Sequence, residues 1–361
     1  MTRDLTSSTP VLDAPAPARG RADRTQYVIV EPGGWNLHHS HWGASAVLAD
    51  IVAGPEFAIQ RIEARHKSEP DAWFGDAECE AGLLVDPARR VLLFFGARRQ
   101  VMHLDLRAAL FQVLARTWPG WTVLWAYGGL ADLRAYVGAE RRSEDLPAAI
   151  PLVDRRAFPV SVSQFKAPWW SDSIGTLVTV RHAAGAVLVH SLDRELAPVW
   201  EGPALVGRMP PGAHQLDAAS WPACGVHLDL GRRAVSLWTA STFPGWRGGR
   251  FRALWSGWEV TFWQDRIGDQ LVAAGGAVRV PPVRLPAGAV RLAHLLRDAW
   301  GEPVTVPELA WLGGLTPVVG PVFAEGVSAQ ALAEDAVSPT RAERRDVFAI
   351  LHGIAAAGTG G

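Results

Sequence analysis

An internal repeat restricts the fold of this chain more than any other feature of its sequence. GLLVDPARRVLLFF at 82–95 matches GVHLDLGRRAVSLW at 225–238. Further on, WPGWTVLWAYGGLADLRAYVG at 118–138 matches WSGWEVTFWQDRIGDQLVAAGG at 255–276. Because the two matches occur in the same order, they indicate a tandem duplication of one folding unit.

A weaker upstream match extends the repeat and sets its boundaries. TQYVIVEPGGWNLHHS at 25–40 aligns without gaps to TLVTVRHAAGAVLVHS at 176–191, and this alignment pairs His39 with His190. The predicted organisation is a disordered N-terminal segment 1–24, copy 1 at 25–138, a connecting segment 139–175, a diverged copy 2 at 176–276 and a partly helical C-terminal extension 277–361.

Each copy is predicted to contain two consecutive β-hairpins followed by a helix. Turn residues at 32–34 separate the first two strands, and Asp86 followed by Pro87 favours a type I turn between the next two. DLRAALFQVLARTW at 105–118 has apolar residues at helical spacing, with Asp105 as the expected N-cap. The unit reads roughly as ββββαβα, which predicts an α+β fold with mainly antiparallel sheets and helices on one face.

The first helix of the unit is expected to be shortened in copy 2. Its counterpart, TFPGWRGGRFRALW at 242–255, contains Pro244 and the pair Gly248–Gly249. Proline and glycine both disfavour a helix interior, so only the last turn or two should remain helical.

Composition excludes several classes of protein. The chain has 361 residues, of which 48% are hydrophobic and 20% charged, as in soluble globular proteins. The net charge of -1 provides no basic field for nucleic acid. No stretch approaches 18 apolar residues, so no membrane span is expected. With Cys79 and Cys224 as the only cysteines and no apolar signal segment in 1–24, the sequence predicts a cytoplasmic protein.

Copy 1 carries a histidine cluster in WNLHHSHWGA at 35–44. Side chains alternate along a strand, so His39 and His41 should share one face about 7 Å apart, while His38 should lie on the other. One divalent metal ion fits between two such imidazoles, and imidazole also suits acid–base chemistry near neutral pH.

An acidic ladder follows in copy 1. If this stretch is extended, Asp76, Glu78 and Glu80 share one face, and they complete a ligand or acid–base set with His39 and His41. The corresponding stretch of copy 2, LDAASWPACG, lacks these carboxylates. The alternative is a solvated edge strand on which like charges prevent pairing, with the histidines in structural contacts to tryptophan.

Seventeen tryptophans in the chain supply anchors for a core or for a partner. Trp35 and Trp42 flank the histidine cluster, and Trp169 and Trp170 lie in the connecting segment. Two adjacent tryptophans need an apolar surface, so the pair is predicted to dock, either on the repeats of this chain or on a partner.

The leading functional prediction is a non-enzymatic binding or regulatory protein, of the kind represented by immunity proteins and antitoxins. Its partner would be another protein or a small ligand. No phosphate-loop, dinucleotide-binding, zinc-protease or serine-hydrolase motif occurs, and no cofactor is evident. The alternative is a metal-dependent or acid–base hydrolase with its site in copy 1, with His39, His41 and Glu78 as the catalytic candidates.

Overall fold

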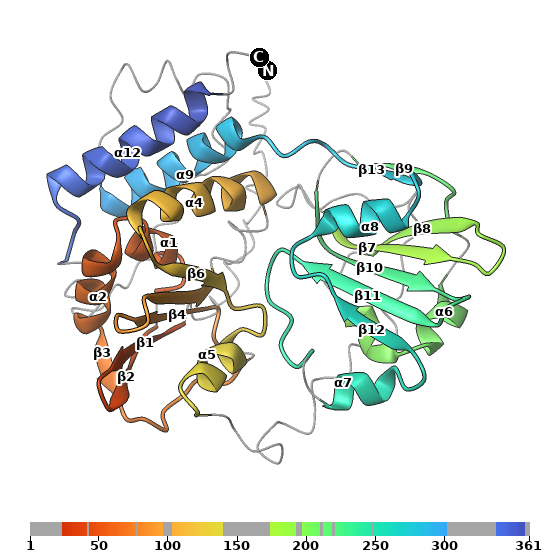
Figure 1. Ribbon diagram of the computed structural model, residues 1–361, viewed down its shortest axis with the longest axis horizontal. Coiled ribbons are helices and arrows are strands. Elements are labelled where there is room, and N and C mark those ends of the chain that lie inside the picture. The colour runs from red at the N-terminus through yellow and green to blue at the C-terminus, as the bar shows by residue number, and fades with distance from the viewer. Residues whose placement is uncertain are drawn as a thin grey trace, which may run out of the picture.

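A computed structural model describes most of the chain and places it in two β-sheets surrounded by helices (Figure 1). The structure describes residues 24–41, 43–76, 78–96, 103–139, 174–192, 197–209, 212–218, 221–246, 249–301 and 337–357.

The sheet of copy 1 has six strands in the order β3-β2-β1-β4-β5-β6. The strands are β1 (Thr25–Glu31), β2 (Gly34–Ser40), β3 (His66–Ser68), β4 (Ala81–Asp86), β5 (Val91–Phe95) and β6 (Thr122–Trp125). The predicted hairpins β1–β2 and β4–β5 are both antiparallel. The sequence did not predict the parallel pairs, β1 with β4 and β5 with β6, that join these hairpins into one sheet.

The sheet of copy 2 repeats this arrangement over its five strands, in the order β12-β11-β10-β7-β8. The strands are β7 (Ile174–Arg181), β8 (Val187–Leu192), β10 (Pro222–Asp229), β11 (Ala234–Thr239) and β12 (Glu259–Phe262). The parallel and antiparallel pairs follow in the same order as in copy 1. Even the register agrees, because Thr25 faces Ala81 and the aligned Thr176 faces the aligned Cys224.

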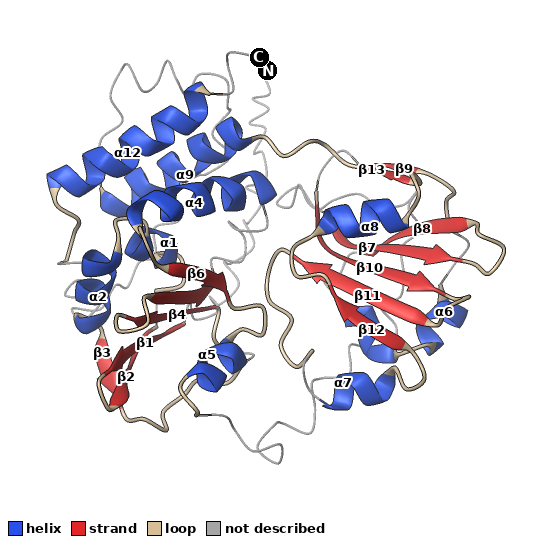
Figure 2. Cartoon of the chain, viewed as in Figure 1, coloured by secondary structure: helices blue, strands red, loops and turns tan. Residues whose placement is uncertain are grey.

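The fold is α+β, as predicted, and helices lie on both faces of each sheet rather than on one (Figure 2). In copy 1 they are α1 (Val47–Ile51), α2 (Pro55–Glu63), α4 (Leu104–Thr117) and α5 (Leu130–Tyr136). In copy 2 they are η3 (Ala197–Glu201), α6 (Ala204–Arg208), α7 (Gly249–Leu254) and α8 (Ile267–Ala273). The reason is visible in β4, whose residues are buried without alternation. A strand that is apolar on both faces needs cover on both.

The repeated W-x-G-W motif makes the same tertiary contact in each copy. The indole Nε1 of Trp118 donates to the carbonyl of Ile51 at 2.7 Å, and that of Trp255 donates to the carbonyl of Val199 at 2.9 Å. Both tryptophans are fully buried. Ile51 and Val199 therefore occupy equivalent places, which extends the correspondence of the copies into a region where the sequence alignment has no match.

Helix α4 differs from the prediction at its first turn. The N-cap is His103, and the predicted cap Asp105 lies inside the helix. Its carboxylate instead accepts from the backbone N–H of Arg284 at 2.6 Å, where the chain returns from copy 2. In the counterpart of α4 in copy 2, residues 242–255, the described residues are helical only at Gly249–Leu254, as the proline and glycines of that stretch predicted.

The C-terminal residues return to copy 1. After the short strand pair β9 (Leu216–Asp217) and β13 (Val278–Arg279), helices α9 (Leu285–Trp300) and α12 (Arg341–Ala356) lie over α4 (Figure 1). Their apolar residues belong to the same core as the sheet of copy 1. No helix among the described residues is both long enough and apolar enough to cross a membrane.

The two copies meet at Arg107 of α4. Its guanidinium is almost completely buried and lies over the ring of Trp125, 4.1 Å from the ring centroid. It donates to the hydroxyl of Tyr127 at 3.0 Å and forms an ion pair with Asp265 of copy 2 at 3.1 Å. Trp125 donates in turn to the carbonyl of Ser241 at 2.9 Å. These contacts hold the end of β6 against copy 2.

Candidate functional site

The structure brings the predicted histidines together and adds a third. His39 lies on β2, His41 follows directly after that strand, and His66 lies on the edge strand β3 opposite His39. The ring centroid of His39 is 5.2 Å from that of His41 and 4.8 Å from that of His66. His41 and His66 are exposed, whereas His39 is half-buried.

Aromatic rings extend this group across the same face of the sheet. Phe74 lies 5.5 Å from His39 and 6.0 Å from His41, measured between ring centroids. Trp35 and Trp73 lie 5.6 Å apart, and both are half-buried. We call this set the imidazole–aromatic cluster, and its members are Trp35, His39, His41, His66, Trp73 and Phe74.

The acidic residues do not form the predicted ladder, because they lie in a loop before β4. Asp76 accepts from Arg134 of α5 at 2.8 Å, and Glu78 pairs with Arg24 at 3.4 Å. The backbone N–H of Glu80 donates to the carbonyl of Arg24 at 2.9 Å. Among the residues described, no three His, Cys, Asp or Glu groups are arranged to hold a metal ion.

His39 has a hydroxyl partner within the cluster. Its Nδ1 lies 2.6 Å from the Oγ of Ser68, at the end of β3. This contact fixes the orientation of the imidazole, and an imidazole beside a serine hydroxyl is also the arrangement in which a general base acts on a nucleophile.

The register of the hairpins corrects the pairing of histidines between copies. Tyr27 faces His38 in copy 1, and the aligned Val178 faces His190 in copy 2. His190 is therefore the counterpart of His38 and not of His39. Burial lowers the pKa of both imidazoles, so each is kept neutral inside the scaffold. His38 is a structural residue common to both copies, and His39 belongs to copy 1 alone.

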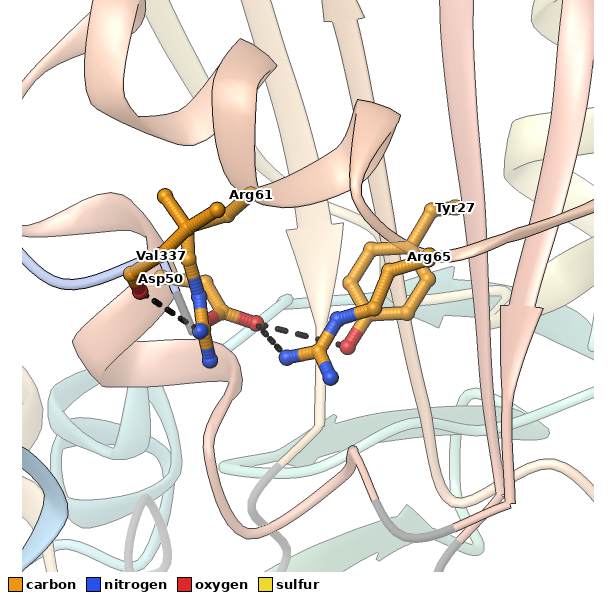
Figure 3. Close-up of polar contacts among 5 residues, drawn as sticks. All are labelled: Tyr27, Asp50, Arg61, Arg65 and Val337. Carbon is orange, nitrogen blue, oxygen red and sulfur yellow. Dashed lines mark hydrogen bonds and ion pairs between the residues drawn. The ribbon is translucent and has the colours of Figure 1, made fainter. Parts of the chain in front are cut away.

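A second polar group in copy 1 was not predicted and is buried; Figure 3 shows its contacts. Asp50 of α1 accepts from the Nε of Arg61 at 2.8 Å and from the Nη2 of Arg65 at 3.4 Å. The hydroxyl of Tyr27 lies 3.3 Å from the same carboxylate, and burial raises the pKa of this phenol. Arg61 also donates from Nη1 to the carbonyl of Val337 at 2.7 Å. We call Tyr27, Asp50, Arg61 and Arg65 the charged cluster.

The described residues of copy 2 contain no equivalent of the charged cluster. The position of Tyr27 is occupied by Val178, and the Gly-Pro pairs at 54–55 and 202–203 align Asp50 with Pro198 and Arg61 with Met209. This alignment is consistent with the matching contacts of Trp118 and Trp255. The Gly-Pro pair is the sequence signal that identifies the charged cluster as specific to copy 1.

Copy 2 has a buried polar network of its own beneath α8. The side chain of Gln270 accepts from Trp238 at 2.5 Å and donates to the hydroxyl of Thr179 at 3.1 Å. That hydroxyl lies 2.9 Å from the Nδ1 of His227. The aligned residues of copy 1 are all apolar and buried, and they are Val28, Leu84, Phe95 and Leu133.

Trp42, Trp169 and Trp170, which the sequence predicted as binding residues, lie outside the described residues. Comparison with known proteins finds no matching family model, no matching curated protein and no matching solved structure. The evidence on function is therefore the geometry of this chain.

Proposed function

We propose that the protein is a non-enzymatic binding or regulatory protein that contacts its partner through the imidazole–aromatic cluster of copy 1. The observation that carries this proposal is the gathering of three imidazoles and three aromatic rings beside the edge strand β3. The partner is another protein or a small ligand that buries these rings.

The chemistry of the cluster supports contact more than catalysis. Rings with an apolar body and a polar edge are the side chains that most often anchor an interface. Two of the carboxylates predicted to act with His39, Asp76 and Glu78, form ion pairs with arginines, which reduces their value as acid–base partners. Copy 2, which shares the scaffold, has Val187 in place of Trp35 and Ser191 in place of His39.

Replacing the two exposed histidines of the cluster should weaken partner binding without unfolding the protein. We expect the double variant His41→Ala/His66→Ala to lower affinity about tenfold or more, as for the loss of interface anchors, because both side chains are exposed in the free protein. The measurement is capture of partners from an extract of the source organism, followed by titration of the captured molecule.

The matched control is His214→Ala, which removes an exposed histidine of copy 2. It should capture the same partner as the unmodified protein. Capture that is equal for all three proteins, or that is lost equally in the control, would contradict the proposed surface.

A hydrolase remains the second candidate because of the contact between His39 and Ser68. In this role His39 would take the proton from the Ser68 hydroxyl as the oxygen attacks an ester carbonyl, and it would later protonate the leaving group. An active serine should be labelled by a fluorophosphonate, and Ser68→Ala should abolish that labelling. A protein that is not labelled, and that does not hydrolyse activated esters above the rate of the Ser68→Ala variant, would rule out this candidate.

A further inference from the structure

We infer that Arg61 is a latch for the C-terminal segment, and that Asp50 orients it for this role. The guanidinium of Arg61 donates from Nε to Asp50 at 2.8 Å and from Nη1 to the carbonyl of Val337 at 2.7 Å (Figure 3). One donor group thus connects the interior of copy 1 to a segment almost three hundred residues further along the chain.

The latched carbonyl lies just before a helix whose start is well defined. Thr340 caps α12, and its side chain and that of Glu343 form a capping box with the backbone. Arg344 then donates to the carbonyl of Pro339 at 2.9 Å. Fixing Val337 therefore fixes the position from which α12 starts.

The helix that follows is held on copy 1 mainly by its apolar face. Phe348 packs against Trp300 of α9, with 5.8 Å between ring centroids, and the guanidinium of Arg297 lies 4.6 Å from the Phe348 ring. Apolar contacts are not directional, so they tolerate sliding of one helix along another. A directed polar contact fixes the position of one helix along another, which apolar contacts alone do not.

Among the described residues, the charged cluster occurs only in the copy that carries the C-terminal helices. The described residues of copy 2 place no helix of the C-terminal region over η3 and α6, and the positions of Asp50 and Arg61 there are Pro198 and Met209. The scaffold folds without the charged cluster in the copy that α12 does not cover. The buried charges and the segment that they hold occur together.

The latch can be separated from a general role in the core by hydrogen exchange of the full-length protein. Arg61→Lys keeps a positive charge beside Asp50 but has a single nitrogen, which cannot occupy the positions of both Nε and Nη1. We expect the amides of α12 to exchange about tenfold faster in Arg61→Lys, the effect of losing one hydrogen bond from a charged donor. Amides of β1 and β4 should exchange as in the unmodified protein.

Tyr27→Phe is the matched control, since it removes a different contact of Asp50 and leaves Arg61 in place. It should leave exchange in α12 unchanged. Exchange in α12 that is unaffected by Arg61→Lys, or that is accelerated equally by Tyr27→Phe, would overturn the latch. If the lysine variant folds poorly, the quadruple variant Tyr27→Val/Asp50→Leu/Arg61→Met/Arg65→Met, which removes the buried charges together, provides the second measurement. It should accelerate exchange in α12 to at least the same extent.

Discussion

Replacing Asp50 by alanine is expected to destabilise the protein by about 3–5 kcal/mol, the effect of removing one partner from a buried ion pair. The side chain of Asp50 is 1% exposed, and those of Arg61 and Arg65 are 8% and 3% exposed. Water therefore cannot replace the carboxylate, and both guanidinium groups would lose the counter-charge that they share. Urea unfolding followed by tryptophan fluorescence measures the loss as a lower midpoint.

The quadruple variant Tyr27→Val/Asp50→Leu/Arg61→Met/Arg65→Met should recover most of that loss. It follows copy 2 at Tyr27 and Arg61 and makes the whole cluster apolar. Replacing a complete buried ion pair with apolar residues of similar volume is often neutral or stabilising, whereas breaking the pair is not. A quadruple variant less stable than Asp50→Ala would show that the charged cluster itself stabilises copy 1.

The sequence predicted the scaffold better than it predicted the site. Repeated segments and turn residues identified the hairpins and the shortened α7, because these follow from local chemistry. The parallel pairing of Thr25 with Ala81 was not predicted, since two hairpins can join in several ways and the alternation of side chains is the same in each.

Two predictions about individual residues were wrong, and each has a local structural cause. His190 was paired with His39 because the turn of copy 2 is one residue longer: Arg181 faces Val187 there, whereas the aligned Val30 faces Trp35 in copy 1. One residue of slip moves a side chain to the opposite face of the sheet. The carboxylates of copy 1 were placed on a strand because their alternation suggested one, but a loop with arginine partners satisfies the same pattern.

The histidine cluster was predicted from spacing along one strand, and its third member was not. His66 comes from an edge strand of three residues, too short to produce a periodic pattern. The charged cluster was missed for a related reason, because Tyr27, Asp50 and Arg61 lie on three different elements. Sequence spacing finds side chains on one element, whereas convergence of several elements is a property of the fold.

Replacing Gln270 by leucine, the residue that copy 1 has at Leu133, should destabilise copy 2 by about 2–3 kcal/mol. Gln270 is fully buried and is the acceptor for the indole N–H of Trp238. A buried donor that loses its acceptor costs about 1–3 kcal/mol, and the hydroxyl of Thr179 loses a donor as well. The reverse change, Leu133→Gln, should also destabilise, because it buries an amide among apolar side chains.

Replacing the whole polar network of copy 2 by the four aligned residues of copy 1 should restore the stability that Gln270→Leu alone removes. Thr179→Val/His227→Leu/Trp238→Phe/Gln270→Leu recreates an apolar set that is already buried in copy 1. We expect its free energy of unfolding at pH 7 to be within about 1 kcal/mol of the unmodified protein, because it removes donors and acceptors together. A quadruple variant as unstable as Gln270→Leu alone would mean that the two copies are not interchangeable at this face.

The stability of the quadruple variant of copy 2 should be less sensitive to acid than that of the unmodified protein. Burial lowers the pKa of His227 from its ordinary value of 6.5 to about 4, so the folded protein keeps this imidazole neutral where the unfolded chain binds a proton. Its contribution to stability is complete above pH 6.5 and is lost as the pH falls through 4. Over that interval the unmodified protein should lose about 3 kcal/mol that the quadruple variant retains. Equal losses for the two proteins in urea titrations at pH 7 and pH 4 would show that His227 is not held neutral by this network.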